Sequence, residues 1–381
     1  MKKTQALSIL LIFLLPGLPG RGEAGAEAWG FFAHQRINHL AVFALPQPLA
    51  AYFKKHIDFL TIHAVDPDKR RYAVPGEAER HFIDLDVYGD FPFDTLPRSY
   101  REARAKFLEI DLLNEQGDTS PLIAPGLYEL SLGLMWFRAG ALAEAERPLS
   151  WEQYLDAIDE YFISRKGDLK TPSCRQLRKI FELPSDCGCE KVLLESHLDE
   201  HGILPWHLLR AYRQLVKAFE TGEQKRILKQ AADIGHYIAD AHVPLHTTEN
   251  YNGQLSGQEG IHAFWESRLP ELFSDSYDFF VGPAKYIEQP ADFFWEAVFD
   301  SHRLVDSVLT EERALRQNYP AEEVYCYEER GTVQLRTTCR PYAEAYHQRL
   351  HGMVERRMRA AIHAVASIWY SAYVEAGSPV L

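Results

Sequence analysis

Two pairs of metal-capable side chains in helical spacing dominate one stretch of the chain, residues 231–266. His236 and Asp240 lie four residues apart in an apolar pattern typical of a helix, and His262 and Glu266 repeat that spacing farther on. Residues four apart lie on one face of a helix, so both side chains of a pair can reach the same ion. The pattern therefore predicts two helices whose polar faces could share a metal site.

A fifth candidate ligand, His246, lies between the two pairs, just after a proline at residue 244 that disturbs the first helix. Imidazole nitrogens and carboxylate oxygens are the usual zinc ligands other than sulfur. A single pair of this kind is usually explained by satisfied polar groups between helices. Three imidazoles and two carboxylates buried together without a cation would be costly to desolvate, so the five residues together indicate a metal site.

The first 28 residues have the pattern of a secretory signal peptide. Two lysines precede a short apolar run over residues 6–15, and the sequence Ala-Glu-Ala at 26–28 is a small-x-small cleavage site. We expect cleavage after Ala28, which would leave Trp29 as the amino terminus of a secreted or periplasmic protein. The apolar run is too short to span a bilayer and no later stretch is long enough, so no transmembrane segment is predicted.

The chain carries a formal net charge of −13. An acidic protein repels nucleic acid and anionic membranes at long range, so any affinity for phosphate must come from a local site. Bound zinc would supply positive charge at such a site.

Five cysteines in an exported chain predict two disulfides and one remaining thiol. Cys326 and Cys339 bracket a short segment and could pair. Cys174 could pair with either Cys187 or Cys189. A zinc site at the Cys-x-Cys motif formed by the last two residues is the alternative.

Helical periodicity dominates the rest of the chain, and alternating strand patterns are scarce. Amphipathic or buried helices are predicted over residues 48–63, 99–113, 124–145, 151–163, 203–220, 223–241, 291–316 and 341–376. We therefore expect an all-α fold, a multi-helix bundle with long loops. Residues 165–200 are rich in charge, proline and cysteine, and are expected to be irregular.

The predicted amino terminus carries a further candidate ligand group. His34 follows Trp29 by five residues. An α-amino group has a pKa of only about 8 and can bind zinc once deprotonated. The alternative interpretation is an aromatic N-terminal segment that packs over the core.

A second group lies between residues 63 and 86. Asp66 precedes His81 by 15 residues, and other acids and cations lie close by. These neighbours are Asp68, Asp84, Asp86, Lys69, Arg70 and Arg71. The cations are either a solvated basic stretch, or one of them points its charge at a bound phosphate.

Taken together, these groups resemble the trinuclear-zinc family of type I single-strand-specific nucleases and bacterial zinc-dependent phospholipase C. The matching residues are Trp29, His34, Asp66, His81, His236, Asp240, His246, His262 and Glu266. The match covers about 29–106 and 198–270, and the C-terminal helices fit. Residues 107–197 match no part of the pattern and are expected to be an insertion or a divergent helical layer in one domain spanning 29–381.

The resemblance implies three zinc ions at the bottom of a cleft. The first would be held by Asp66, His81, His236 and Asp240. The second would be held by His246, His262 and Glu266. The third would be held by the amine and carbonyl of Trp29, by His34 and by Asp240, which would bridge two ions.

The resemblance also implies residues that meet the substrate. Phe82 matches an aromatic that stacks a base or packs a head group, although an ordinary core phenylalanine would fit the same position. Asp84 matches an acid beside the substrate. Lys69 falls where the nucleases tend to carry arginine, and Arg70 is adjacent, so either cation could join Asp66 and Asp84 in the catalytic group.

Three functions remain open at this point. The spacings of Trp29 to His34 and of Asp66 to His81 favour a secreted endonuclease that cuts single-stranded RNA or DNA. Glu266 and the short loop that precedes it favour a phospholipase C acting on phospholipid head groups. A non-catalytic exported protein stabilised by zinc is the third, but structural zinc sites are usually closed by four protein ligands. The sequence indicates no protein partner.

Overall fold

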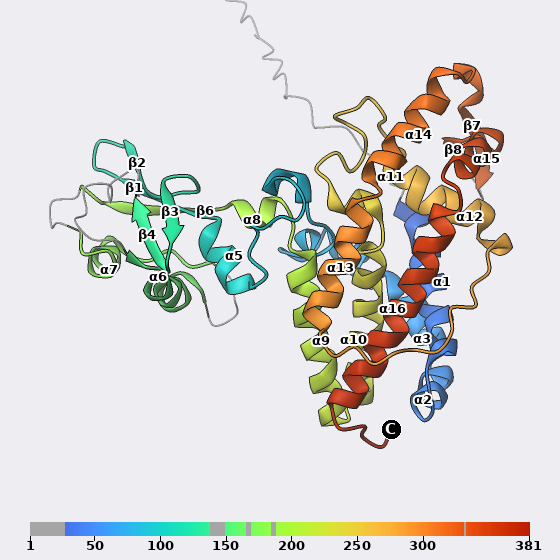
Figure 1. Cartoon of the computed structure of the whole chain (residues 1–381), viewed down its shortest axis with the longest axis horizontal. Helices are drawn as coiled ribbons and strands as arrows, with labels where there is room; N and C mark the ends of the chain where they lie inside the picture. Colours follow the sequence, from blue (N-terminus) through green and yellow to red (C-terminus); the bar gives the residue numbers. More distant parts are fainter. Residues whose placement is uncertain (1–26, 138–148, 165–168, 184–187, 331–332) are drawn as a thin grey trace, which may run out of the picture.

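The computed structural model describes residues 27–137, 149–164, 169–183, 188–330 and 333–381. Figure 1 shows a large body of helices and, beside it, a smaller lobe that carries most of the strands. The α-helices are α1 (Glu27–Ala41), α2 (Leu49–Lys55), α3 (Ile57–Ile62), α4 (Asp66–Arg70), α5 (Tyr100–Lys106), α6 (Trp151–Ala157), α7 (Cys174–Ile180), α8 (His197–Glu200), α9 (Leu204–Thr221), α10 (Gln224–Asp240), α11 (Ile261–Ala263), α12 (Leu269–Phe273), α13 (Pro290–His302), α14 (Val305–Gln317), α15 (Arg340–Arg349) and α16 (Met353–Glu375). The strands are β1 (Leu108–Leu113), β2 (Thr119–Ile123), β3 (Tyr128–Ser131), β4 (Leu134–Phe137), β5 (Leu149–Ser150), β6 (Lys191–Ser196), β7 (Tyr325–Arg330) and β8 (Val333–Thr338).

Helix α10 lies at the centre of the helical body, in contact with α1, α3, α9 and α16. Its last ten residues, 231–240, are all buried. The chain reaches α10 from α9 through Gly222, whose φ of 68° is the left-handed conformation that commonly ends a helix. Because this half of α10 is buried on every side, the polar groups it carries must find partners inside the protein.

A glycine allows α1 to pack closely against α10. A Cβ atom at Gly235 would lie 2.1 Å from Oδ1 of Asn38, so a larger residue would force the two helices apart. The Nδ2 of Asn38 donates to the carbonyl oxygen of Ala232 at 3.1 Å, which holds the helices at this spacing. The same approach places the ring of His34 on that of His236, with 4.0 Å between ring centroids.

Large aromatic side chains fill the core beneath this contact. Trp369 of α16 and Phe53 of α2 are wholly buried and pack edge to face, with 5.0 Å between ring centroids. The Nε1 of Trp369 donates to the carbonyl oxygen of Ala231 at 3.0 Å, so its one polar group is satisfied. Burying each such side chain stabilises the fold by about 1.5–3 kcal/mol, which gives the polar end of α10 a rigid support.

The smaller lobe has a hydrophobic cluster of its own, built from residues 105–192. One three-stranded sheet has the order β2-β1-β6 and another has the order β3-β4-β5. Strand β1 pairs with β6 from Leu108, opposite Ser196, to Leu113, opposite Lys191. A disulfide joins Cys174 to Cys189, which resolves the pairing that the sequence left open and leaves the Cys189 sulfur unavailable to a Cys-x-Cys zinc site. Cys187 lies outside the described residues.

The protein is mostly helical, but the expectation of an all-α fold was wrong in detail. The helix predicted over 99–113 ends at Lys106 and continues as strand β1, and the segment predicted as a helix over 124–145 contains β3 and β4. In β1 the buried residues alternate with half-buried ones, as expected for a strand with one covered face. The segment 165–200, expected to be irregular, contains α7, β6 and α8.

The C-terminal part adds two helices and a hairpin to the helical body. Strands β7 and β8 pair antiparallel, and the predicted disulfide between Cys326 and Cys339 is confirmed. Figure 1 shows this hairpin beside α15 at one end of the body. Across the described residues, none of the helices combines the length and the apolar character that crossing a membrane requires.

Candidate metal centre

Seven predicted ligands come together in the helical body, although they arise from five separate segments. His34 comes from α1, His81 follows a 3-10 turn at 78–80, and His236 and Asp240 lie on the last turns of α10. His246 lies in the 3-10 turn Pro244–Thr247. His262 lies on α11, and Glu266 lies on the π-helical turn Phe264–Arg268 that follows it.

The carboxylate of Asp240 lies between four imidazoles. Its Oδ2 is 3.0 Å from Nδ1 of His81 and 3.3 Å from Nε2 of His236. Its Oδ1 is 3.5 Å from Nε2 of His34 and 3.8 Å from Nε2 of His246. Each oxygen therefore faces a different pair of histidines, the arrangement of a carboxylate that can bridge two cations.

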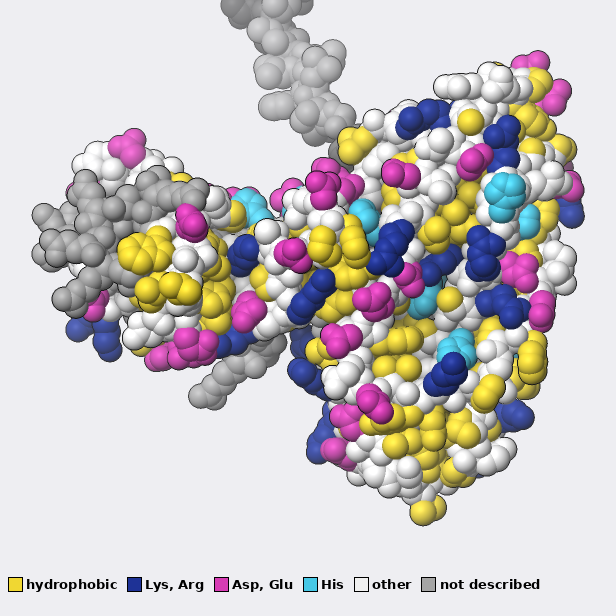
Figure 2. All heavy atoms as spheres, in the orientation of Figure 1, with side chains coloured by type: hydrophobic (Ala, Val, Ile, Leu, Met, Phe, Trp, Pro, Cys, Tyr) yellow, Lys and Arg dark blue, Asp and Glu magenta, His cyan; other side chains and the backbone are white. Residues whose placement is uncertain are grey.

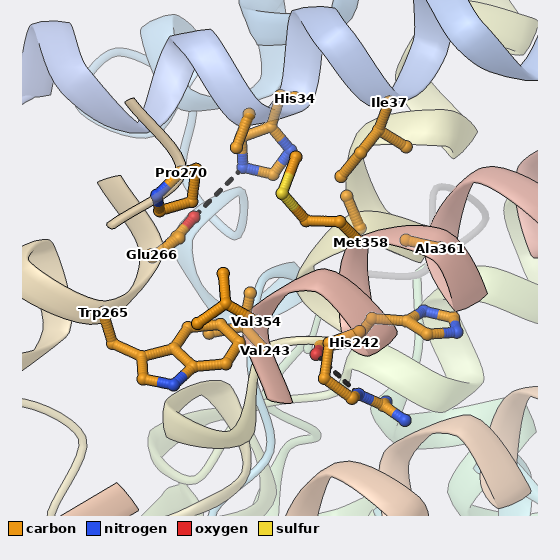
Figure 3. Close-up of a pocket in the computed structure, with 13 residues that line it drawn as sticks. His34, Ile37, His242, Val243, Trp265, Glu266, Pro270, Val354, Met358 and Ala361 are labelled. Carbon is orange, nitrogen blue, oxygen red and sulfur yellow. Dashed lines mark hydrogen bonds and ion pairs between the residues drawn. The ribbon is translucent and has the colours of Figure 1, made fainter. Parts of the chain in front are cut away.

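Glu266 gathers the histidines on the other side of the centre. Its Oε2 lies 2.8 Å from Nε2 of His262 and 3.3 Å from Nε2 of His246. Its Oε1 lies 3.2 Å from Nε2 of His34, the contact drawn as a dashed line in Figure 3. Glu266 thus connects the α11 segment to α1.

Backbone carbonyls orient two of the imidazoles. Nδ1 of His236 is 2.8 Å from the carbonyl oxygen of Ala64, and Nδ1 of His246 is 2.6 Å from the carbonyl oxygen of His81. When Nδ1 donates to a carbonyl, the lone pair of the neutral ring is on Nε2, which faces the centre. Metal-binding histidines in proteins are commonly oriented in this way.

Three groups of side chains in this region could each hold a metal ion. They are His34 with His236 and Asp240, Asp68 with His81 and His236, and His246 with His262 and Glu266; in each group the ligand atoms lie within 4.8 Å of one another. Nitrogen and carboxylate donors of this kind suit zinc. Nδ1 of His34 and Nε2 of His81, the ring nitrogens opposite those that face Asp240, are buried and have no hydrogen-bond partner among the described residues.

The electrostatics of the centre favour a positive charge. Burial would lower the pKa of His236 and His246, but the carboxylates around them outweigh it and raise both to about 9. Burial would raise the pKa of Asp240 and Glu266, yet the neighbouring histidines hold each well below its usual range. Without a metal, the charged carboxylates are thus balanced by protonated imidazoles, and a bound cation would displace those protons.

Asp66 is not where the resemblance placed it. Its carboxylate contacts Nδ1 of His63 at 2.6 Å and Nζ of Lys69 at 3.1 Å. Asp68 takes its place, with Oδ1 3.6 Å from Nε2 of His236 and 3.8 Å from Nδ1 of His81. The helix that carries both acids, α4, is only five residues long, and on it Asp68 points to His81 and His236 while Asp66 points to His63 and Lys69.

The two cations expected near a phosphate have different surroundings. The guanidinium of Arg70 is held by Asp233 at 3.2 Å and by the buried Glu77 at 3.1 Å, so it braces α10. Lys69 is about half exposed, and its Nζ lies 6.0 Å from the ring centroid of Phe31 on α1. Of the two, Lys69 is the one that can reach a ligand.

The side chain of Trp29 lies outside the described residues, although the backbone of α1 passes through it. The structure therefore places His34 in the centre and leaves the predicted role of the Trp29 amine and carbonyl as a prediction.

The two residues expected to meet the substrate lie beside the loop at 201–204. Phe82 is half-buried and packs against Gly202, where a Cβ would come within 2.7 Å of its ring. Asp84 is buried, and its Oδ2 lies 3.4 Å from Nδ1 of His201. Burial raises the pKa of Asp84 to about 6 despite this contact, and Asp86 and Glu249 contribute to the rise.

Asp84→Asn is expected to stabilise the metal-free protein at pH 8. A carboxyl whose folded-state pKa exceeds its unfolded value destabilises the fold once ionised, a cost that grows as pH rises from about 4 to about 6. Removing the charge should therefore raise the free energy of unfolding by about 1–3 kcal/mol at pH 8 and by much less near pH 4.5. Denaturant unfolding with a chelator at both pH values measures this. Equal changes at the two pH values would contradict the assignment.

A small apolar cavity of about 30 Å³ lies behind His34 and Glu266. Figure 3 shows Val243, Trp265 and Met358 around it. The guanidinium of Arg357 closes one end, where its Nε donates to the carbonyl oxygen of His242 at 3.0 Å. This apolar backing lowers the local dielectric and strengthens the charge interactions in the centre.

Asp68 is a ligand candidate that was predicted from the sequence only as a nearby acid. The signal was the sequence Asp-Pro-Asp, in which two acids precede His81 by 15 and 13 residues.

Comparison with models of known protein families and with curated proteins finds no match to this chain.

Proposed function

We propose that the protein is an exported zinc-dependent phosphodiester hydrolase, and that it cuts single-stranded nucleic acid. One observation carries the proposal: the two oxygens of Asp240 face different pairs of histidines, so one buried carboxylate can serve two metal ions at once. Two disulfides fit an oxidising compartment outside the cytoplasm.

The ligand groups fit a hydrolytic centre better than a purely structural one. Each group has three protein ligands, whereas structural zinc sites usually have four. When bound, zinc ions would lower the pKa of a coordinated water and neutralise phosphate oxygens. The protein's own residues hold the ligands in place: Asp240 and Glu266 together contact five histidines, and Arg70 braces the helix that carries Asp240.

The nucleic-acid substrate is supported by the spacing of the predicted ligands and by the position of Lys69. Lys69 extends from α4, the helix that also supplies Asp68, so its charge lies beside the centre. A phosphate drawn to this cation would lie next to the metal ligands. Asp66, its ion-pair partner, would then hold Lys69 in position instead of binding metal.

Phospholipase C activity is the second candidate, because the loop next to the centre exposes apolar side chains. Tyr251 and Leu255 are 50% and 67% exposed, and the carbonyl oxygen of Tyr251 is 3.3 Å from Nδ1 of His262. Exposed apolar residues around a site are typical of a surface that meets lipid. Glu266 in place of an aspartate points the same way.

The deciding experiment assays the zinc-loaded mature protein on RNA, single-stranded DNA and phosphatidylcholine side by side. Hydrolysis of nucleic acid that stops when zinc is removed and returns when it is restored is the expected result. Hydrolysis of phosphatidylcholine alone would favour the second candidate. A zinc-loaded, folded protein that hydrolyses none of the three would refute the proposal.

Activity is also expected to depend on where the signal segment is cut. If the amine of Trp29 binds zinc, a protein that begins at Trp29 should hold about one more zinc ion than one with Met before Trp29, because a peptide nitrogen cannot replace a free amine. Hydrolysis should be at least about tenfold faster in the cut form. Zinc content and rates are measured on both forms at neutral pH. Equal zinc and equal rates would remove Trp29 from the ligand set.

A further inference from the structure

A second cavity, of about 550 Å³, lies on the far side of the segment that carries His262 and Glu266. We call it the hairpin pocket, because strands β7 and β8 form one wall. Its polar lining consists of Asn252, Glu259, Ser267, Arg268, Arg316, Tyr325, Arg336, Thr337, Thr338 and Tyr342. This volume is in the range of pockets that bind small ligands.

The hairpin pocket and the metal centre share one wall. His262 and Glu266 point from α11 and the following π-helical turn into the metal centre, whereas Ala263 and Ser267 of the same turns line the pocket. A helix with its side chains is about 10 Å across, so a ligand in the pocket lies roughly one helix width from the metal centre. One loop lies beside both the metal centre and the pocket, because its residue Tyr251 contacts His262 and the next residue, Asn252, lines the pocket.

Arginines give the hairpin pocket its charge. Arg316 is bound to the buried Glu312 at 2.7 Å, and Arg268 is bound to Glu328, so these two charges are largely compensated. Arg336 is exposed, its guanidinium lies 3.8 Å from the ring centroid of Tyr325, and it forms no ion pair among the described residues. The carboxylate of Glu259 also lines the pocket, so the pocket presents one guanidinium stacked on an aromatic ring together with one carboxylate.

The walls of the pocket are rigid. The disulfide between Cys326 and Cys339 closes the base of the hairpin. Glu312 accepts hydrogen bonds from Arg316 and from the hydroxyl of Tyr342 at 2.8 Å, which joins α14 to α15 beneath the cavity. A cavity with walls held in this way needs little rearrangement to accept a ligand.

We propose that the hairpin pocket binds a nucleotide of the single-stranded substrate that lies beyond the two joined by the bond being cut; this rests on the proposed function. Arg336 would meet a phosphate, and its plane stacked on Tyr325 gives a base a surface to stack on. Since the whole chain is acidic, and basic and acidic side chains are mixed over the face in Figure 2, a local arginine of this kind is needed to hold a polyanion.

The test compares Arg336→Glu with Arg213→Glu, a matched charge reversal at an exposed residue of α9, which contributes nothing to the pocket. Binding of a nuclease-resistant phosphorothioate oligonucleotide to the zinc-loaded protein is measured by fluorescence anisotropy. Arg336→Glu should weaken binding about tenfold or more, Arg213→Glu less than about twofold, and Arg336→Lys should restore part of the loss. The hydrolysis rate for a dinucleotide, which is too short to reach the pocket, should stay the same in all three variants.

Equal weakening by the two glutamate variants would overturn the proposal, and so would an equal loss on the dinucleotide. If Arg336→Glu lost phosphatidylcholine turnover while its oligonucleotide binding stayed unchanged, the pocket would be assigned to lipid, and the proposal would be overturned as well. The binding measurement does not depend on hydrolysis. If the protein cuts no phosphodiester while Arg336→Glu still weakens oligonucleotide binding, the proposed function fails and the pocket stands.

Discussion

Replacing Asp240 with alanine is expected to remove bound zinc and to abolish hydrolysis together. Asp240 belongs to the candidate metal group of His34 and His236, and its Oδ2 lies 3.0 Å from Nδ1 of His81, a member of a second group, so its loss affects both groups. It also removes the carboxylate that most raises the pKa of His236 and His246. We expect a rate decrease of at least about a thousandfold, equivalent to about 4 kcal/mol of transition-state stabilisation.

Zinc content by elemental analysis and the rate on single-stranded DNA are measured on the same samples. Asp240→Asn keeps the shape of the side chain and guards against a loss caused by misfolding. The matched control is His242→Ala, two residues farther on, which is buried and bonded to the carbonyl oxygen of Ile238 at 2.7 Å. This variant should lose about 1–3 kcal/mol of stability but retain its zinc. Near-normal turnover of either Asp240 variant would show that the centre has been misassigned.

The ligands on long helices could be predicted from the sequence because local geometry decides them. In His236 and Asp240, a spacing of four residues fixes the direction of both side chains once the segment is a helix. The pair His262 and Glu266 follows the same reasoning, and its segment is helical even though the turn after α11 is π-helical. What the sequence could not provide was the close packing that brings these pairs together. That depends on contacts such as Gly235 with Asn38, almost two hundred residues away.

The smaller lobe was predicted poorly for a related reason. Leu108, Ile110 and Leu112 alternate in burial, but apolar residues two and four apart also fit a short helical pattern. Strand β1 is stabilised by pairing with β6, about eighty residues farther along the chain. The sequence contains both strands and no local signal that joins them. The hairpin pocket was beyond prediction for the same reason, because its walls come from distant segments.

Asp66 and Asp68 show where sequence reasoning reached its limit. Both precede His81 at spacings that a loop can accommodate, and both lie on the same one-turn helix. Only the direction of each side chain distinguishes them, and that direction depends on Lys69 and His63 holding Asp66 outward. A resemblance based on spacing chose Asp66, whereas the geometry of the folded chain brings Asp68 to the histidines.

This difference yields the second large effect. Asp68→Asn is expected to lower zinc content and to slow hydrolysis about a hundredfold, because it removes a charged ligand 3.6 Å from Nε2 of His236. Asp66→Asn, the same change two residues away, should retain its zinc and lose less than about tenfold in rate, through a Lys69 that is held less firmly.

Zinc titration separates the two assignments more cleanly than activity does. The weakest zinc-binding site should disappear from the titration curve of Asp68→Asn, whereas the titration curve of Asp66→Asn should match that of the parent protein. The reverse result, with zinc lost only in Asp66→Asn, would mean that α4 turns by roughly half a revolution when metal binds, so that Asp66 faces His81 as the resemblance implied. The direction of a single turn of helix would then be set by the metal, and His63 and Lys69 would hold Asp66 outward only in the metal-free protein.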